Sequence, residues 1–173
     1  MTRTTIGYGA ITSIPERASM ASYHYVDEWQ FRAPIEAVWN EISDPLDWAS
    51  WWSSFLCVEQ TEPGDAQSVG AVHRYTVKGA LPYRVSFEMR TTVVEKHRRI
   101  EGEALGDVRG RGIWVFSTDG KMTHVRYDWI VDTTRPWMIQ LAPVLAPLFG
   151  WNHHFVMRRG LEGLKARLQS RGY

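Results

Sequence analysis

The chain has 173 residues and a mass of 20.0 kDa, enough for one domain with a substantial core. Hydrophobic residues make up 44% and charged residues 23%, which argues against a disordered chain. The formal net charge is only +1, so no bulk charge favours nucleic acid or an anionic membrane as partner. The single cysteine, Cys57, excludes an internal disulfide framework and a cysteine-rich zinc site. Cys57 itself is expected to be a small buried hydrophobe.

The N-terminal segment shows no clear periodicity, which predicts a flexible tail over residues 1–22 and one domain over residues 23–169. Arg3, Glu16 and Arg17 interrupt the segment, so it does not resemble a signal peptide and a cytoplasmic location is expected. Met20 precedes the first patterned segment and is an alternative start of the natural protein.

The longest apolar stretch, residues 137–151, is too short to span a membrane and is broken by Pro143, Pro147 and Gly150. We therefore expect no integral membrane segment. Residues 137–149 are apolar nearly all round, which indicates a helix buried on several sides, a mobile lid, or a patch that contacts a membrane or a second subunit.

Taken in chain order, the pattern begins with a strand over residues 23–32, in which Tyr25, Asp27, Trp29 and Phe31 share one face. Ala33-Pro34 ends it, and two short helices follow. Strands are then predicted over residues 55–61, 69–78, 83–95, 99–105, 109–117 and 123–132. A helical pattern occupies residues 136–169, with a kink or break expected at its two prolines.

The later strands each place large apolar side chains on one face. The predicted inward residues are Tyr83, Val85, Phe87, Met89, Thr91, Val93, Gly110, Gly112, Trp114, Phe116, Val125, Tyr127, Trp129 and Val131. Six consecutive strands with short turns predict an antiparallel sheet. Its aromatic face needs a cover, and only the last helix is long enough to provide one.

Several segments carry a resemblance to a known family. They are Ala33-Pro34-Ile35-Glu36-Ala37-Val38-Trp39, Ser43-Asp44-Pro45 with Trp48 and Trp51-Trp52, the Gly70 strand, the Gly110–Trp114 strand and Gly160-Leu161-Glu162-Gly163-Leu164. With this order of elements, the chain resembles the START-like (SRPBCC) superfamily of polyketide cyclases/dehydrases and lipid-transfer proteins. The resemblance implies an α+β helix-grip fold, in which a seven-stranded antiparallel sheet curves around the C-terminal helix and leaves an apolar cavity.

The inward polar residues Asp27, Tyr83, Tyr127 and His153 also favour a cavity over a solid core, because unpaired burial of polar groups is costly. Asp27 is either a polar anchor or base in the cavity, or a structural acceptor. His153 is either a cavity acid/base or a satisfied core histidine, and His154 competes with it for the inward position. The predicted ligand-binding residues are Asp27, Trp29, Tyr83, Phe87, Trp114, Phe116, Tyr127, Trp129, His153 and Met157.

Other polar residues receive structural interpretations. Arg74 is expected on the exposed side of its strand, and His124, Arg126 and Asp128 on a solvated outer face. Gly110 and Gly112 lack the third glycine and the following helix of a dinucleotide site. The six histidines show no ligand spacing, so neither a metal nor a cofactor is expected.

No catalytic motif is recognised, so catalytic residues remain unassigned and enzyme activity remains open. The leading hypothesis is binding or transport of an apolar small molecule such as a lipid, polyketide or aromatic compound. The alternative is a polyketide cyclase/dehydratase that uses acid/base residues in the same cavity. A second alternative is a protein-interaction module, for instance a homodimer, that uses residues 137–149.

Overall fold

The computed structural model describes residues 22–133 and 136–173, with side chains described for residues 23–132 and 147–173. The predicted tail lies outside this part, except Ser22, which begins the first strand. The elements are β1 (Ser22–Phe31), α1 (Ile35–Ile42), the 3₁₀-helix η1 (Pro45–Asp47), α2 (Trp48–Trp51), β2 (Phe55–Glu62), β3 (Val72–Lys78), β4 (Arg84–Glu95), β5 (Arg99–Gly106), β6 (Val108–Thr118), β7 (Thr123–Thr133) and α3 (Pro136–Ser170).

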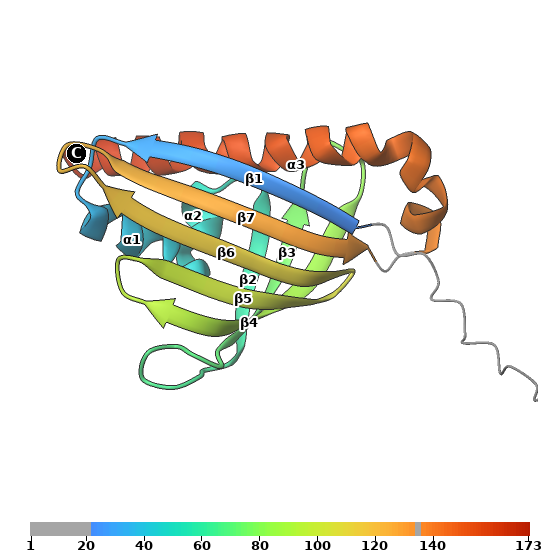
Figure 1. The fold of residues 1–173 in the computed structure, drawn as a ribbon, viewed down its shortest axis with the longest axis horizontal. Coiled ribbons are helices and arrows are strands. Elements are labelled where there is room, and N and C mark those ends of the chain that lie inside the picture. Colours follow the sequence, from blue (N-terminus) through green and yellow to red (C-terminus); the bar gives the residue numbers. More distant parts are fainter. Residues whose placement is uncertain (1–21, 134–135) are drawn as a thin grey trace, which may run out of the picture.

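The strands form one antiparallel sheet of seven strands in the order β1-β7-β6-β5-β4-β3-β2. Figure 1 shows this sheet curving alongside α3, with α1 and α2 at one end. The predicted helix-grip fold is thereby confirmed. The long helix also changes direction in its first turns, which agrees with the kink expected from its prolines (Figure 1).

The second half of α3 packs against the tryptophans of α2. A Cβ atom at Gly160 would overlap Cε2 of Trp52, and one at Gly163 would overlap the backbone oxygen of Trp51. Only glycine permits so close an approach. The indole Nε1 of Trp52 donates a hydrogen bond to the carbonyl of Val156 at 2.8 Å, so the contact is polar as well as apolar.

A buried carboxylate also ties α1 to the end of α3. Glu41 is 4% exposed and forms ion pairs with Arg167 and Arg171, and Arg167 also contacts Asp47. A buried charge needs such partners, because removing a carboxylate from water without compensation is costly.

Two predictions about strand faces are wrong. Cys57 is exposed, because it lies on β2, an edge strand that pairs only with β3 and whose side chains are mostly uncovered. Within β4, the pairing with β5 shifts register between Thr91 and Val93. Such a bulge reverses the alternation beyond it, so Val94 rather than Val93 lines the interior.

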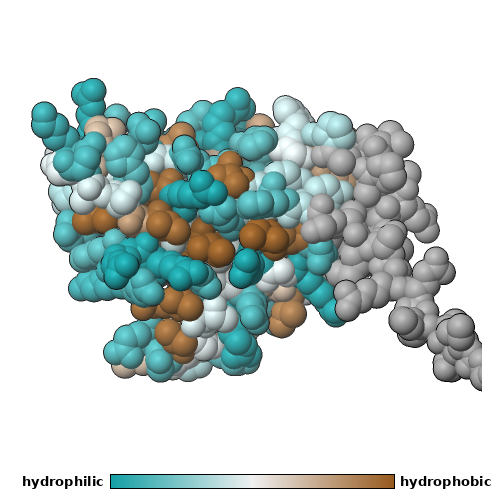
Figure 2. Space-filling model, in the orientation of Figure 1, coloured by the Kyte–Doolittle hydropathy of each residue, from teal (hydrophilic) through white to brown (hydrophobic). Residues whose placement is uncertain are grey.

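The outer face of the sheet mixes charged and apolar side chains, as Figure 2 shows. Asp128 accepts hydrogen bonds from Arg126 and is paired with His24 at 3.0 Å, which agrees with the predicted solvated polar face. Among the described residues, no helix is both long and apolar enough to cross a membrane.

Candidate ligand-binding site

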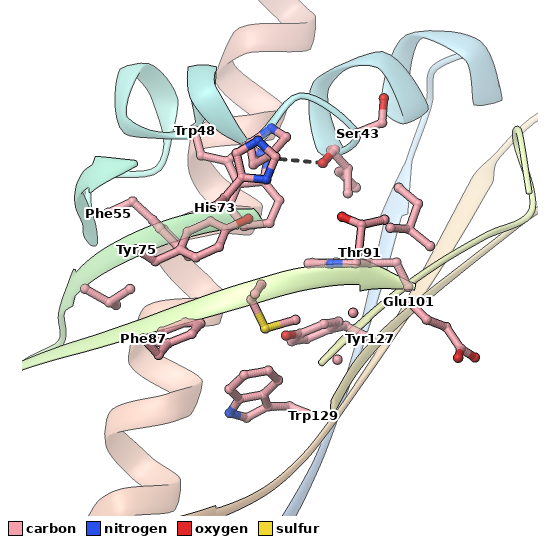
Figure 3. Close-up of a pocket in the computed structure, with 18 of the residues that line it drawn as sticks. Ser43, Trp48, Phe55, His73, Tyr75, Phe87, Thr91, Glu101, Tyr127 and Trp129 are labelled. Atoms are coloured by element: carbon pink, nitrogen blue, oxygen red, sulfur yellow. Dashed lines mark hydrogen bonds between the residues drawn. The ribbon is translucent and has the colours of Figure 1, made fainter. Parts of the chain in front are cut away.

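A cavity of about 750 Å³ lies between the inner face of the sheet and α3. Every strand of the sheet contributes to its wall, and α3 contributes Phe149, Asn152, His153, Val156 and Met157. Figure 3 shows the aromatic side chains of β3, β4 and β7 around this space. Its size falls within the range of typical small-molecule sites.

Two groups of stacked rings form the wall. On β6 and β7 the rings of Trp114 and Tyr127 stack at 4.0 Å, and Trp129 continues the series at 6.0 Å from Tyr127. On β3 and β4 the rings of Tyr75 and Phe87 stack at 5.4 Å. In each directly stacked pair the two residues are opposite one another in the sheet register, so strand pairing itself positions the rings.

Gly112 on β6 leaves space for the rings on β6 and β7, because it has no side chain. A Cβ atom at Gly112 would lie 2.7 Å from the hydroxyl oxygen of Tyr127. The glycine predicted on the inward face of this strand therefore allows a close approach of Tyr127 to the backbone.

Three ionisable groups of the wall, on His73, Tyr75 and Tyr127, are held neutral by burial. Burial lowers the pKa of His73, which is 6% exposed, although the nearby charge of Asp44 opposes the shift. Burial raises the pKa of Tyr75 and Tyr127, so both phenols keep their protons. The buried hydroxyl of Tyr23 has no hydrogen-bond partner among the described residues. These groups can orient a ligand by hydrogen bonds rather than by charge.

An acid–base pair lies at the α3 side of the cavity. His153 Nε2 and Asp27 Oδ2 are 2.8 Å apart, and both side chains are nearly buried. The ring of Tyr25 stacks on His153 with centroids 4.4 Å apart and an interplanar angle of 16°. His154 approaches the other Asp27 oxygen at 3.4 Å but is largely exposed. His153 lines the cavity, whereas Asp27 lies behind it.

The structure places the predicted ligand-binding residues in three groups. On the cavity wall are Phe87, Trp114, Tyr127, Trp129, His153 and Met157. Trp29 and Phe116 belong to the packed core, in ring contact with neighbouring aromatics. Asp27 and Tyr83 lie off the wall, Asp27 as the partner of His153 and Tyr83 just before β4.

Sequence reasoning did not select His73 and Tyr75, although both are buried in the wall. Their two-residue spacing on a predicted strand was the available indication. Arg74 between them is exposed and paired with Glu88 at 2.8 Å, as its structural interpretation requires. Glu101 belongs to a strand of the wall, but its carboxylate points away from the cavity in Figure 3 and pairs with Arg99. Within the described part of the chain, no group of three or more potential ligands is arranged to hold a metal ion.

Solved structures similar to this chain share its fold at low sequence identity. TTHA0849 from Thermus thermophilus matches with a TM-score of 0.70 and 20% identity, over 87% of this chain and 100% of that one. The Zhui aromatase/cyclase from Streptomyces sp. R1128 matches with a TM-score of 0.66 and 21% identity, over 88% and 99%. A START superfamily protein from Mycobacterium smegmatis matches with a TM-score of 0.69 and 12% identity, over 85% and 97%.

Comparison with curated proteins found no significant sequence match. A family model described as polyketide cyclase/dehydrase and lipid transport matches residues 24–169, which is most of the chain. This family covers hydrophobic ligand binding and polyketide cyclase chemistry, and the sheet, the long helix and the aromatic cavity suit both. The chain therefore belongs to the polyketide cyclase/dehydrase and lipid transport family.

Proposed function

We propose that the protein binds a flat, largely apolar small molecule in the cavity between the sheet and α3. The observation that carries this proposal is the aromatic wall around a space of about 750 Å³. Stacked rings present broad apolar faces, and planar ring systems pack well against such faces. The neutral hydrogen-bonding groups among them can orient hydroxyl or carbonyl groups on the ligand.

The wall favours an uncharged ligand over a fatty-acid anion. Among the described residues that line the cavity there is no arginine, and the one lysine, Lys96, is exposed to solvent. A carboxylate inside the cavity would lose its hydration, and no lysine or arginine is buried in the described wall to compensate its charge.

The proposal predicts that filling the cavity weakens binding. Val85 lines the cavity on β4, so Val85→Trp should reduce the affinity for neutral polycyclic aromatic compounds by about tenfold or more, because the indole would occupy space that the ligand needs. Thermal unfolding with a panel of polycyclic aromatics and long-chain fatty acids measures this, because a bound ligand raises the midpoint.

The matched control is Val115→Trp, since Val115 is 39% exposed on the outer side of β6. This variant should respond to the ligands as the unchanged protein does. A panel that stabilises neither the unchanged protein nor the control would contradict the proposed function, and so would equal stabilisation of all three proteins.

Cyclase or dehydratase chemistry is the second candidate function, and the Asp27–His153 pair beside the cavity favours it. The similar structures named as aromatase/cyclases, including Zhui and the di-domain ARO/CYC proteins BexL and StfQ, add support at the level of the fold. A carrier returns its ligand unchanged, whereas a dehydratase releases a product lighter by one water. Mass spectrometry of ligand recovered after incubation distinguishes the two.

A further inference from the structure

We propose that His153, oriented by Asp27, accepts a proton from an acidic hydroxyl group, such as that of a phenol or an enol, on the molecule bound in the cavity. This inference rests on the proposed binding function. It gives the Asp27–His153 pair a chemical role and narrows the ligand to molecules with an ionisable hydroxyl group.

The hydrogen bond to Asp27 determines which ring nitrogen can act. A carboxylate accepts the bond, so Nε2 of His153 carries the hydrogen that it donates to Oδ2 of Asp27 at 2.8 Å. Nδ1 of the neutral ring then has a free lone pair, and no described residue forms a hydrogen bond with it. The ring lines the cavity, so in the proposed complex Nδ1 is the nitrogen that meets the ligand.

Stacking and burial also fix the plane of the His153 ring. Tyr25 stacks on His153 nearly parallel, at 16°, and the side chain of His153 is only 12% exposed. A base held by an orienting carboxylate and by packing needs little reorganisation when it takes a proton. Asp27 is itself 11% exposed and does not line the cavity, so it acts as a positioning residue.

A His–Asp pair that only joined two neighbouring elements could equally lie on the solvent-exposed face of the sheet. His24 and Asp128 form such a pair on the outer face of β1 and β7, at 3.0 Å, where His24 is 53% exposed. The inner pair instead places an imidazole against an aromatic wall, where an ionisable group is costly unless it is partnered. Each of the two His–Asp pairs uses one residue of β1, but only the inner pair borders the cavity. This difference favours a role of the inner pair in contact with a ligand.

The proton transfer balances within the complex. The ligand O–H bond breaks, an N–H bond forms at Nδ1 of His153, and the products are a ligand oxyanion and an imidazolium. The carboxylate of Asp27 compensates the imidazolium charge. The other titratable groups near the pair are Tyr25 on β1, Tyr127 opposite Asp27 on β7, and His154 on α3. Neither tyrosine competes for the proton, because burial raises the pKa of both phenols.

The test uses 7-hydroxycoumarin, a phenol whose neutral and ionised forms absorb at different wavelengths. Fluorescence anisotropy establishes binding, and absorbance gives the ratio of ionised to neutral probe in the complex at one fixed pH. We expect this ratio to fall about tenfold or more in both His153→Gln and Asp27→Asn, since a neighbouring charge shifts a pKa by about one to three units. His24→Gln, the matched outer variant, should keep the ratio of the unchanged protein.

Each outcome has a distinct meaning. If the probe binds and ionises equally in the unchanged protein and in His153→Gln, His153 is not the proton acceptor, and the binding function stands. If only His153→Gln lowers the ratio, Asp27 has no positioning role. If the probe does not bind the unchanged protein, the proposed function fails for this ligand class and the present inference fails with it. Far-UV circular dichroism confirms that each variant is folded before its ratio is used.

Discussion

At the scale of single residues, three ionisable groups of the cavity wall are kept uncharged by burial. Burial lowers the pKa of the His73 imidazole and raises the pKa of the Tyr75 and Tyr127 phenols. Near neutral pH these side chains can therefore form hydrogen bonds with a ligand, but they carry no net charge that would attract an ion. Such a wall suits a ligand with a few oxygen atoms on an apolar frame.

His73 should make the stability of the protein depend on pH. Its folded-state pKa lies below the ordinary histidine value of 6.5, so below 6.5 the unfolded chain binds a proton that the folded chain does not. Stability should therefore fall as pH decreases through 6.5 toward the folded-state pKa. His73→Gln should weaken this dependence, and urea unfolding at pH 7.5 and at pH about 5.5 would measure it.

The control is His124→Gln, since His124 lies on the outer face and contacts the exposed Asp119 at 3.4 Å. This variant should retain the pH dependence of the unchanged protein. A loss of stability between the two pH values that is the same in His73→Gln and the unchanged protein would show that His73 is not its source.

Individual residues also show where prediction from the sequence ends. Alternation on the first strand correctly predicted that Asp27 faces inward, and the helical stripe predicted the same of His153. Their pairing joins positions 126 residues apart and depends on how α3 lies against β1, which no local pattern contains. The prediction that Cys57 is buried was wrong for a related reason, because strand order decides which strands lie at the edges of the sheet.

At the scale of elements, α3 performs two tasks along its length. Its middle, from Phe149 to Met157, contributes to the cavity wall, and its last turns, with Leu164 and Leu168, pack into the core. The glycines of the final half let the helix approach α2 closely. The wall thus belongs to a helix whose far end is firmly anchored.

Two glycines of α3 should respond in opposite ways to alanine. A Cβ at Gly163 would overlap the backbone oxygen of Trp51, so Gly163→Ala should destabilise the protein by about 1–3 kcal/mol. At Gly150 the nearest atom, Cε1 of Tyr25, would be 3.5 Å away. Gly150→Ala should therefore stabilise by about 0.5–1 kcal/mol through helix propensity.

Urea unfolding of both variants measures these free energies. Because the two changes are chemically identical and lie in one helix, propensity cannot explain a difference in sign. Gly163→Ala at or above the stability of the unchanged protein would mean that α3 and α2 are not in close contact.

The elements themselves could be predicted more completely than their registers. Sequence pattern and turn residues indicated all seven strands, and alternation is clearest where one face is buried and the other exposed, as in β6. The bulge between Thr91 and Val93 was not predictable, since a bulge is defined by the partner strand. It exchanges Val93 for Val94 on the cavity wall.

At the scale of the whole molecule, one core connects the sheet to the helices. The buried cluster contains Trp29 of β1, Trp39 of α1, Trp52 after α2, Trp114 of β6 and Leu164 of α3. The cavity lies beside this cluster, on the same inner face of the sheet. Trp52 and Trp114 belong to this cluster and also line the cavity, so stability and binding share part of one inner face.

This shared core predicts that the described domain unfolds as one unit. Leu164 is 0% exposed and belongs to the cluster, so Leu164→Ala should destabilise the protein by about 2–5 kcal/mol. Tryptophan fluorescence reports the cluster and far-UV circular dichroism reports the backbone, and in Leu164→Ala both urea midpoints should fall together.

Leu148→Ala on the same helix removes a side chain that is 38% exposed and should change stability by less than about 0.5 kcal/mol. Fluorescence and circular dichroism midpoints that separate in Leu164→Ala would show instead that α3 leaves the sheet before the tryptophan cluster unfolds, and the cavity would then have a wall that opens independently of the core.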